Sequence, residues 1–152
     1  MRGDSWASEY AMVTAYAQWL ERHGWTTAQE IACYELRIDL VAWHDTAYPD
    51  YVVYEAKLQP SLAVMAQALR HRLIAPWVAV IVPVVSEAFL TVCQALGLGV
   101  VVFPPNADPD YRIPAVDHRE DIVPFVRDHV YNTLQAARAR RLGLLDEAGD
   151  LS

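Results

Sequence analysis

Residues 37–57 read RIDLVAWHDTAYPDYVVYEAK, two aliphatic and aromatic stretches separated by a short polar segment that contains a proline. Branched aliphatic and aromatic residues are typical of strands, and aspartate and proline between such stretches are typical of a turn. The pattern predicts two consecutive strands joined by a turn at residues 44–50. Each stretch carries an acid, Asp39 or Glu55, and the second ends at Lys57, the only lysine in a chain with eleven arginines.

The charged residues of these two strands suggest a metal site. Side chains alternate along a strand, so we expect Glu55 and Lys57 on one face of the second strand. Asp39 stands in an apolar run, where a carboxylate without partners is unfavourable. If the strands are adjacent, Asp39 and Glu55 converge, and a divalent cation bound by both would relieve their repulsion. Lys57 would then stabilise developing negative charge or orient an attacking water. The alternative is a solvent-exposed lysine at a strand end, paired with Glu55.

The segment before residue 37 is expected to form a helix and two strands. Ser5 is a good N-cap, and apolar residues at helical spacing continue until Gly24, a common helix terminator. The stretch 26–43 is rich in residues with high strand propensity and predicts two strands that meet near Glu35. With the strand at 51–58, this gives an antiparallel meander of three strands.

After Pro60 the hydrophobic period changes from that of a strand to that of a helix. A helix is predicted to start at Pro60, with an apolar stripe of Leu62, Met65, Ala66, Leu69 and Leu73. The run WVAVIVPVV at 77–85 predicts a strand buried on both faces. Ser86 would cap a helix over 87–97, and GVVVF at 99–103 supplies one more strand. Strand, helix and strand at this spacing predict a right-handed parallel crossover.

The carboxy-terminal part differs in composition. Residues 106–120 are acidic and proline-rich and are predicted to be a connecting segment, followed by a helix over about 121–142 with Pro124 in its first turn. The predicted apolar face consists of Ile122, Phe125, Val126, Val130 and Leu134. We divide the chain into a core, residues 1–105, and a segment, 106–152, whose helix packs on or extends from the same domain.

Composition limits the remaining choices. A chain of 152 residues that is 54% hydrophobic fits one domain with a real core. Cys33 and Cys93 lack the spacing of a zinc site or a disulfide framework, so we expect both to be buried thiols. No signal-peptide pattern or membrane-spanning run is present, which predicts a soluble, cytoplasmic protein. The net charge of −7 disfavours a broad basic surface for nucleic acid, so any such contact would be local.

The stretch RIDLVAW, a turn, YVVYEAK and a following helix together resemble the active-site core of the PD-(D/E)XK nuclease superfamily, the restriction-endonuclease-like fold. The predicted order of helix, three-strand meander, helix, strand, helix and strand over residues 5–103 is similar to that core. The resemblance implies a three-layer α/β fold with a mixed sheet, extended here by a C-terminal helix. It matches Asp39 to the first metal-binding aspartate, Glu55 to the second carboxylate and Lys57 to the catalytic lysine. Ile38 stands where a proline often precedes that aspartate.

The same resemblance implies further site residues. Gln67 is similar to the glutamine of the exonuclease-like branch, although His71 stands where that branch has a tyrosine. Glu9 matches a helix glutamate that reaches the metal in some members, and the backbone carbonyl of Ala56 would join Asp39 and Glu55 around Mg²⁺ or Mn²⁺. Gln67 and Glu9 are also compatible with exposed positions on their helices.

Candidate nucleic-acid contacts are Arg37 on the sheet and the run Arg70, His71 and Arg72 on the helix, which is equally compatible with a solvated helix end. The expected function is metal-dependent hydrolysis of DNA, with RNA as the second choice. The alternative is an inactive nuclease-fold scaffold, or a protein-binding subunit of a larger nucleic-acid-processing or defence complex. The C-terminal helix offers a surface for a homodimer or a partner protein.

Overall fold

The strands of the sheet lie in the same order in space as along the chain. The computed structural model describes residues 5–44 and 50–143. Its six-stranded sheet consists of β1 (Thr26–Cys33), β2 (Leu36–Trp43), β3 (Tyr51–Ala56), β4 (Trp77–Val82), β5 (Gly99–Val102) and β6 (Asp110–Ile113). The β1–β2 and β2–β3 pairs are antiparallel, β3, β4 and β5 are parallel, and β6 runs antiparallel to β5. The predicted meander and mixed sheet are confirmed.

The turn between β1 and β2 has local causes. Tyr34 and Glu35 both adopt left-handed backbone conformations, with φ of 49° and 63°. Two consecutive positive φ angles in a two-residue loop match the right-handed twist of the flanking strands. The prediction that the strands meet near Glu35 is confirmed. Most of the turn predicted at 44–50 lies outside the described residues.

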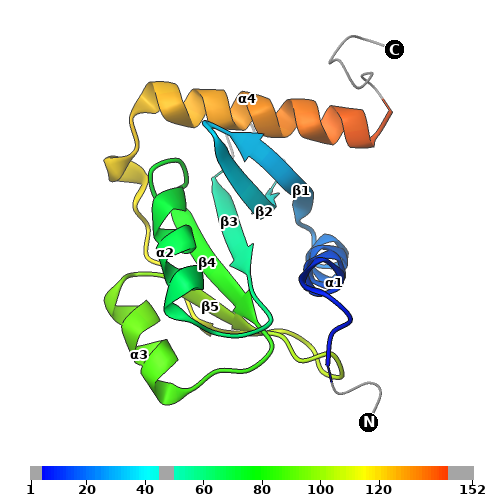
Figure 1. Ribbon diagram of the computed structural model, residues 1–152. Coiled ribbons are helices and arrows are strands. Elements are labelled where there is room, and N and C mark those ends of the chain that lie inside the picture. The colour runs from blue at the N-terminus through cyan, green and yellow to red at the C-terminus, as the bar shows by residue number, and fades with distance from the viewer. Residues whose placement is uncertain (1–4, 45–49, 144–152) are drawn as a thin grey trace.

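Helices cover both faces of the sheet (Figure 1). Helix α1 (Glu9–Arg22) packs on one face, where Met12 and Tyr16 meet Leu40 and Tyr54. Helices α2 (Leu62–His71), α3 (Glu87–Ala95) and α4 (Pro124–Arg141) lie on the other face. The three-layer α/β architecture with an additional C-terminal helix is confirmed.

Several helix ends follow local rules. The predicted Ser86 cap of α3 is confirmed, because its hydroxyl accepts a hydrogen bond from the backbone N–H of Phe89. Pro124 occupies the first turn of α4, as predicted. Helix α1 begins later than expected: Ser8, and not Ser5, is its N-cap, with Oγ 3.0 Å from the Ala11 nitrogen.

The predicted apolar stripe of α2 is partly wrong: Met65 is buried and Leu69 packs against the core, but the other three residues do not belong to the buried face. Leu62 and Leu73 are 75% and 72% exposed, and Ala66 is exposed as well. Leu62 is the first residue of the helix, and Leu73 follows its end, so neither shares the buried face. That face instead consists of Val64, Met65, Ala68 and His71. This difference between the predicted and the observed face matters for function, because the buried face includes His71, which therefore points toward the sheet.

The segment 106–120 is more than a connection. It contains β6, and a 3₁₀ turn, η1 (Arg119–Asp121), starts at its end. The strand β6 is short and largely exposed, so its sequence shows little of the alternation between apolar and polar residues that identifies a half-buried strand. Its pairing with β5 makes it an edge strand of the sheet.

The predictions for the C-terminal helix and the cysteines are largely confirmed. Val130 and Leu134 are buried on the inner face of α4, although Phe125 is 72% exposed. Cys33 and Cys93 are buried free thiols. Within the part of the chain that the structure describes, no helix is long and apolar enough to cross a membrane.

Candidate active site

The candidate site lies where β2 and β3 separate. Their pairing runs from Trp43 opposite Tyr51 to Leu40 opposite Tyr54 and stops there. Asp39 is the next residue on β2, and its Oδ2 accepts a hydrogen bond from the Ala56 backbone nitrogen at 2.9 Å. The carboxylate therefore replaces a backbone carbonyl of β2 as the acceptor for β3, and this hydrogen bond connects the two strands where they diverge.

The strand alternation also changes at this point. Ile38 and Val41 both belong to the core beneath α2, α3 and α4, although strict alternation would put them on opposite faces. On β1, Ala28 and Ile31 show the same change, and Glu30 between them has a positive φ of 53°. This local twist leaves Asp39 between the two layers of helices.

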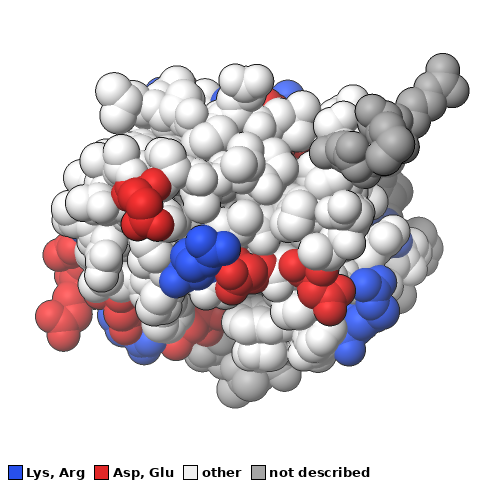
Figure 2. All heavy atoms as spheres, turned by 90° about the horizontal axis from the view of Figure 1, so that it is seen from below, with Lys and Arg blue, Asp and Glu red and all other residues white. Residues whose placement is uncertain are grey.

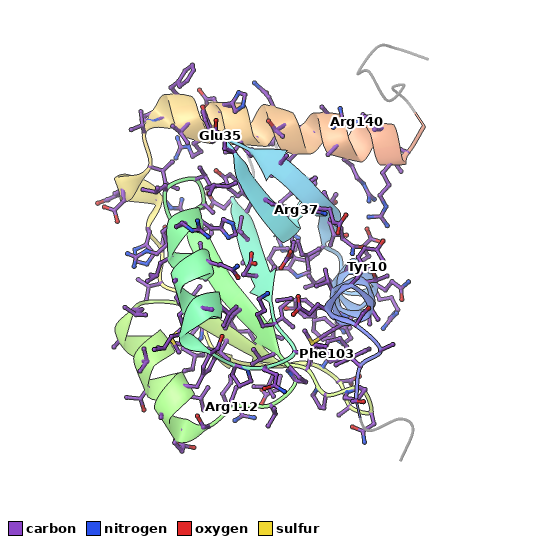
Figure 3. All side chains as sticks on the ribbon, viewed as in Figure 1. Tyr10, Glu35, Arg37, Phe103, Arg112 and Arg140 are labelled. Atoms are coloured by element: carbon purple, nitrogen blue, oxygen red, sulfur yellow. The ribbon has the colours of Figure 1, made fainter. Side chains whose placement is uncertain are left out.

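Asp39 accordingly lines cavities on both sides of the sheet. The first, which we call the acidic cleft, has a volume of about 230 Å³ and opens toward α2. Its walls are Glu35, Leu36, Arg37, Asp39, Glu55, Gln67, Arg70 and His71. The second has a volume of about 170 Å³ and lies toward α1, where Glu9, Tyr10 and Glu30 contribute. Figure 3 labels Arg37 on β2, the strand that carries Asp39, and Tyr10 on α1.

The environment of Glu55 favours the protonated form of its carboxyl group. Its side chain is buried, with 7% of the residue exposed. Burial, followed by the repulsion and hydrogen bonding of Asp39, raises the pKa of Glu55 to about 8, while Lys57 opposes the change. Its Oε2 also has no hydrogen-bond partner among the described residues. A buried acidic oxygen without a partner, next to a second carboxylate, is the arrangement that a bound cation would satisfy.

His71 faces Glu55 from α2, with Nδ1 3.6 Å from Glu55 Oε2. The contact resembles an ion pair by distance, but burial lowers the pKa of His71 while the pKa of Glu55 is raised. Both shifts favour neutral groups, so we interpret the pair as a carboxylic acid beside a neutral imidazole. His71 is also hydrogen-bonded to the backbone of Arg37, so it links α2 to both diverging strands. It was predicted as a phosphate contact, but its burial removes it from the surface.

Gln67 lies one helical turn before His71 and lines the same cleft. Its Oε1 is buried and has no hydrogen-bond partner within the described residues. A buried amide oxygen without a partner is unfavourable unless a ligand or water satisfies it. Gln67 and His71 are four residues apart in the sequence, a spacing that puts both on one face of a helix.

Lys57 lies just beyond β3, so strand alternation does not determine its direction. Its backbone nitrogen donates to the Ile81 carbonyl at 3.1 Å, and its Nζ is 3.8 Å from Glu9 Oε1 on α1. Both side chains of this pair are partly exposed. The charge of Lys57 also lowers the pKa of Glu55 and so partly opposes the effect of burial. The structure thus brings Glu9 to the lysine, whereas the sequence suggested Glu9 as a metal ligand.

The predicted phosphate contacts fall into two groups. Arg37 and Arg70 are exposed at the acidic cleft, and Arg37 is 3.2 Å from Glu30. Arg72 is not in the cleft lining: it donates to the Leu96 carbonyl at 2.9 Å and contacts His118 Nδ1 at 3.0 Å. Arg72 therefore fastens the end of α2 to neighbouring segments, and the sequence alone did not separate this role from that of Arg70.

The donor set is compatible with a hard divalent cation. Asp39, Glu55 and the Ala56 carbonyl supply oxygen atoms, which suit Mg²⁺ or Mn²⁺. Within residues 5–44 and 50–143, no three Asp, Glu, His or Cys side chains are grouped so that they could hold an ion by themselves. Two carboxylates still suffice for Mg²⁺, which commonly retains waters and binds substrate phosphate oxygens.

Comparisons with known proteins support the fold. No protein-family model and no curated protein matches this chain. Among solved structures, the chain is similar to SPO1766, a protein of unknown function from Silicibacter pomeroyi, with a TM-score of 0.65. The two are 17% identical, and the match covers 90% of each chain. A likeness at this identity shows a shared α/β fold and nothing about chemistry.

Proposed function

We propose that this protein is a metal-dependent nuclease that hydrolyses phosphodiester bonds in DNA, with RNA as the second candidate substrate. The observation that carries the proposal is the pair of carboxyl groups at the point where β2 and β3 separate. Asp39 is held there by the Ala56 nitrogen, Glu55 is buried with a raised pKa, and the chain's single lysine lies two residues after Glu55. This is the arrangement that the resemblance to PD-(D/E)XK nucleases leads one to expect.

The residues divide the work as follows. Asp39, Glu55 and the Ala56 carbonyl would hold Mg²⁺ or Mn²⁺, which supplies Lewis acidity toward phosphate oxygens and water when bound. Lys57, oriented by Glu9, stabilises the negative charge that develops on the phosphate. Gln67 offers its unpartnered Oε1 to an attacking water in the cleft. Arg37 and Arg70 at the rim contact neighbouring phosphates.

The surface charge restricts how nucleic acid is held. The net charge is −7, and on the face shown in Figure 2 acidic and basic side chains are interspersed and form no continuous basic stripe. Non-specific binding to duplex DNA normally uses many phosphate contacts. Binding by this chain therefore depends on a few residues at the cleft, or on a second subunit or partner.

The alternative, an inactive scaffold or protein-binding subunit, is favoured by two observations. One is the acidic net charge; the other is the exposed Phe125, a large apolar side chain at the start of α4. The two proposals differ in one measurable property, which is cation binding that depends on Asp39 and Glu55. Calorimetric titration with Mn²⁺ measures it directly, and no such binding would favour the scaffold.

The nuclease proposal is tested by cleavage of a panel that contains linear, circular, single-stranded and branched DNA together with RNA, in Mg²⁺ or Mn²⁺. We expect at least one substrate to be cut, and Asp39→Asn and Lys57→Ala to slow cleavage by about 100-fold or more. Lys57→Arg should remain slow, because a broad planar guanidinium does not place its charge as the compact ammonium group does. Asp110→Asn, at an exposed site on β6, is the matched control and should cleave normally.

Two outcomes would contradict the nuclease proposal. One is a wild-type protein that cuts no member of the panel in either metal. The other is Lys57→Ala protein that cuts as fast as wild type, since the activity would then come from another site or from a contaminant. Folding of each variant is checked by its circular dichroism, so that a loss of activity is not caused by unfolding.

A further inference from the structure

A larger cavity lies at the end of the sheet where β3, β4 and β5 finish, and it shares no lining residue with the acidic cleft. We call it the strand-end groove; its volume is about 520 Å³, within the range of small-molecule sites, roughly 300–1,000 Å³. Its walls come from the segment before α1 and from the loops that follow the three strands. Trp6, Leu58, Pro83 and Pro104 form much of its apolar lining.

The groove adjoins the proposed reaction centre. Leu58 directly follows Lys57, and Trp6 precedes Glu9 by three residues. Lys57 and Glu9 are themselves in contact, with Nζ and Oε1 3.8 Å apart. A strand of nucleic acid whose phosphate reaches Lys57 would therefore bring an adjacent nucleotide to the mouth of the groove.

The aromatic wall of the groove is held in place before any ligand arrives. The indole Nε1 of Trp6 donates to the Phe103 carbonyl at 2.7 Å, and the two rings meet edge to face with centroids 4.9 Å apart. Phe103 is anchored in turn, because its backbone nitrogen donates to the Val82 carbonyl at 2.8 Å. Figure 3 labels Phe103 at this end of the sheet. A wall that is already ordered reduces the entropy lost on binding.

The lining selects the chemistry of the ligand. Among the residues that the structure describes, none of the side chains that line the groove is charged, and the polar ones are Ser5, Gln59 and Asn106. Figure 2 looks at this end of the molecule, where much of the surface is free of charged groups. These described side chains offer no counter-charge to a phosphate, whereas a neutral flat base can pack on the apolar wall. The amides of Gln59 and Asn106 offer both donors and acceptors, which complement the edges of bases.

We propose that the strand-end groove binds one unpaired nucleobase of the substrate strand, next to the phosphate that reaches Lys57. The inference rests on the proposed function for the identity of the substrate, and it adds a position at which the enzyme requires an unstacked base. It implies that single-stranded ends, flaps or distorted sites are bound in preference to intact duplex, since a paired base is not free to enter.

The test is a set of single-stranded DNA oligonucleotides in which one abasic site is moved along the sequence. Their affinity for the wild-type protein is measured by fluorescence anisotropy at pH 7 in EDTA, so that no strand is cut during the measurement. We expect one abasic position to weaken binding by roughly 5- to 100-fold, the range of a single stacked base. The double variant Gln59→Ala, Asn106→Ala should bind the intact strand more weakly and lose this sensitivity. Gln94→Ala removes an exposed amide on α3 and is the matched control.

Equal affinity for every abasic oligonucleotide, or no binding of any oligonucleotide, would overturn the inference. An abasic effect that stays the same in the double variant would overturn it as well. If side-chain amide signals of Gln59 and Asn106 in NMR spectra move with a proline-rich peptide and not with the oligonucleotide, the groove belongs to a protein partner. The Mn²⁺ cleavage assay separates this inference from the proposed function. Abasic-sensitive binding without cleavage would support base binding in the groove and contradict the nuclease proposal. Cleavage without abasic sensitivity would support the nuclease and contradict base binding in the groove.

Discussion

Replacing Glu55 by glutamine should make the metal-free protein more stable in alkaline solution. The change removes an ionisable group from a buried position and retains a side chain of the same shape. The glutamine amide can still donate to Asp39, as the protonated Glu55 does. A stabilising substitution at a proposed catalytic residue would be direct evidence that the site is strained for function.

The size of this stability difference and its dependence on pH follow from the pKa of Glu55, which folding raises from an ordinary value of 4.5 to about 8. Below pH 4.5 Glu55 is protonated in both the folded and the unfolded protein, so its ionisation does not change the free energy of unfolding. Between these values the unfolded chain ionises first, so the stability of the wild type falls as the pH rises. At about 1.4 kcal/mol for each pH unit, the full interval corresponds to about 5 kcal/mol above pH 8.

The measurement is urea unfolding in EDTA at pH 5, 7 and 9, followed by tryptophan fluorescence. The free energy of unfolding of Glu55→Gln should be close to that of the wild type at pH 5 and exceed it increasingly up to pH 9. The exposed Glu120 provides the control, because Glu120→Gln should show no such trend. A difference between Glu55→Gln and wild type that does not change with pH would refute the reasoning. Mn²⁺ should narrow the gap at pH 8 by binding only the wild type tightly.

Three further predictions follow from other contacts. His71→Ala should weaken Mn²⁺ binding and cleavage by about 10- to 100-fold, with partial rescue by His71→Gln, as expected for a residue that orients a metal ligand; calorimetry and single-turnover cleavage measure the two effects. Glu21 accepts hydrogen bonds from Thr27 and from two arginines of α4, which outweigh its burial and lower its pKa. Glu21→Gln should therefore cost about 1 kcal/mol in urea unfolding at pH 7, and the cost should vanish as acid protonates the carboxyl group. If α4 forms a dimer, Phe125→Ser should yield monomers in light scattering with little change in unfolding, because Phe125 is exposed.

Much of the fold could be predicted because its signals are local. The turn at Tyr34 and Glu35, the Ser86 cap and the position of Pro124 each depend on neighbours in the chain. The strand β6 was not predicted because its four residues, three exposed and one partly buried, show no alternation of burial, and only their pairing with β5 defines the strand. The face of α2 was misjudged because leucines at both ends of the helix imitated its buried stripe.

The candidate site divides in the same way. Asp39, Glu55 and Lys57 could be found from sequence because charged residues are conspicuous in or beside apolar strands. The structure alone decided that His71 is buried against Glu55, that Lys57 contacts Glu9 and that Arg72 is tied to Leu96. Each of these contacts joins segments that are distant in sequence, and their geometry depends on how α1 and α2 dock on the two faces of the sheet. Sequence patterns report which residues are unusual for their element, but the electrostatic environment that sets a pKa arises only when several elements pack together.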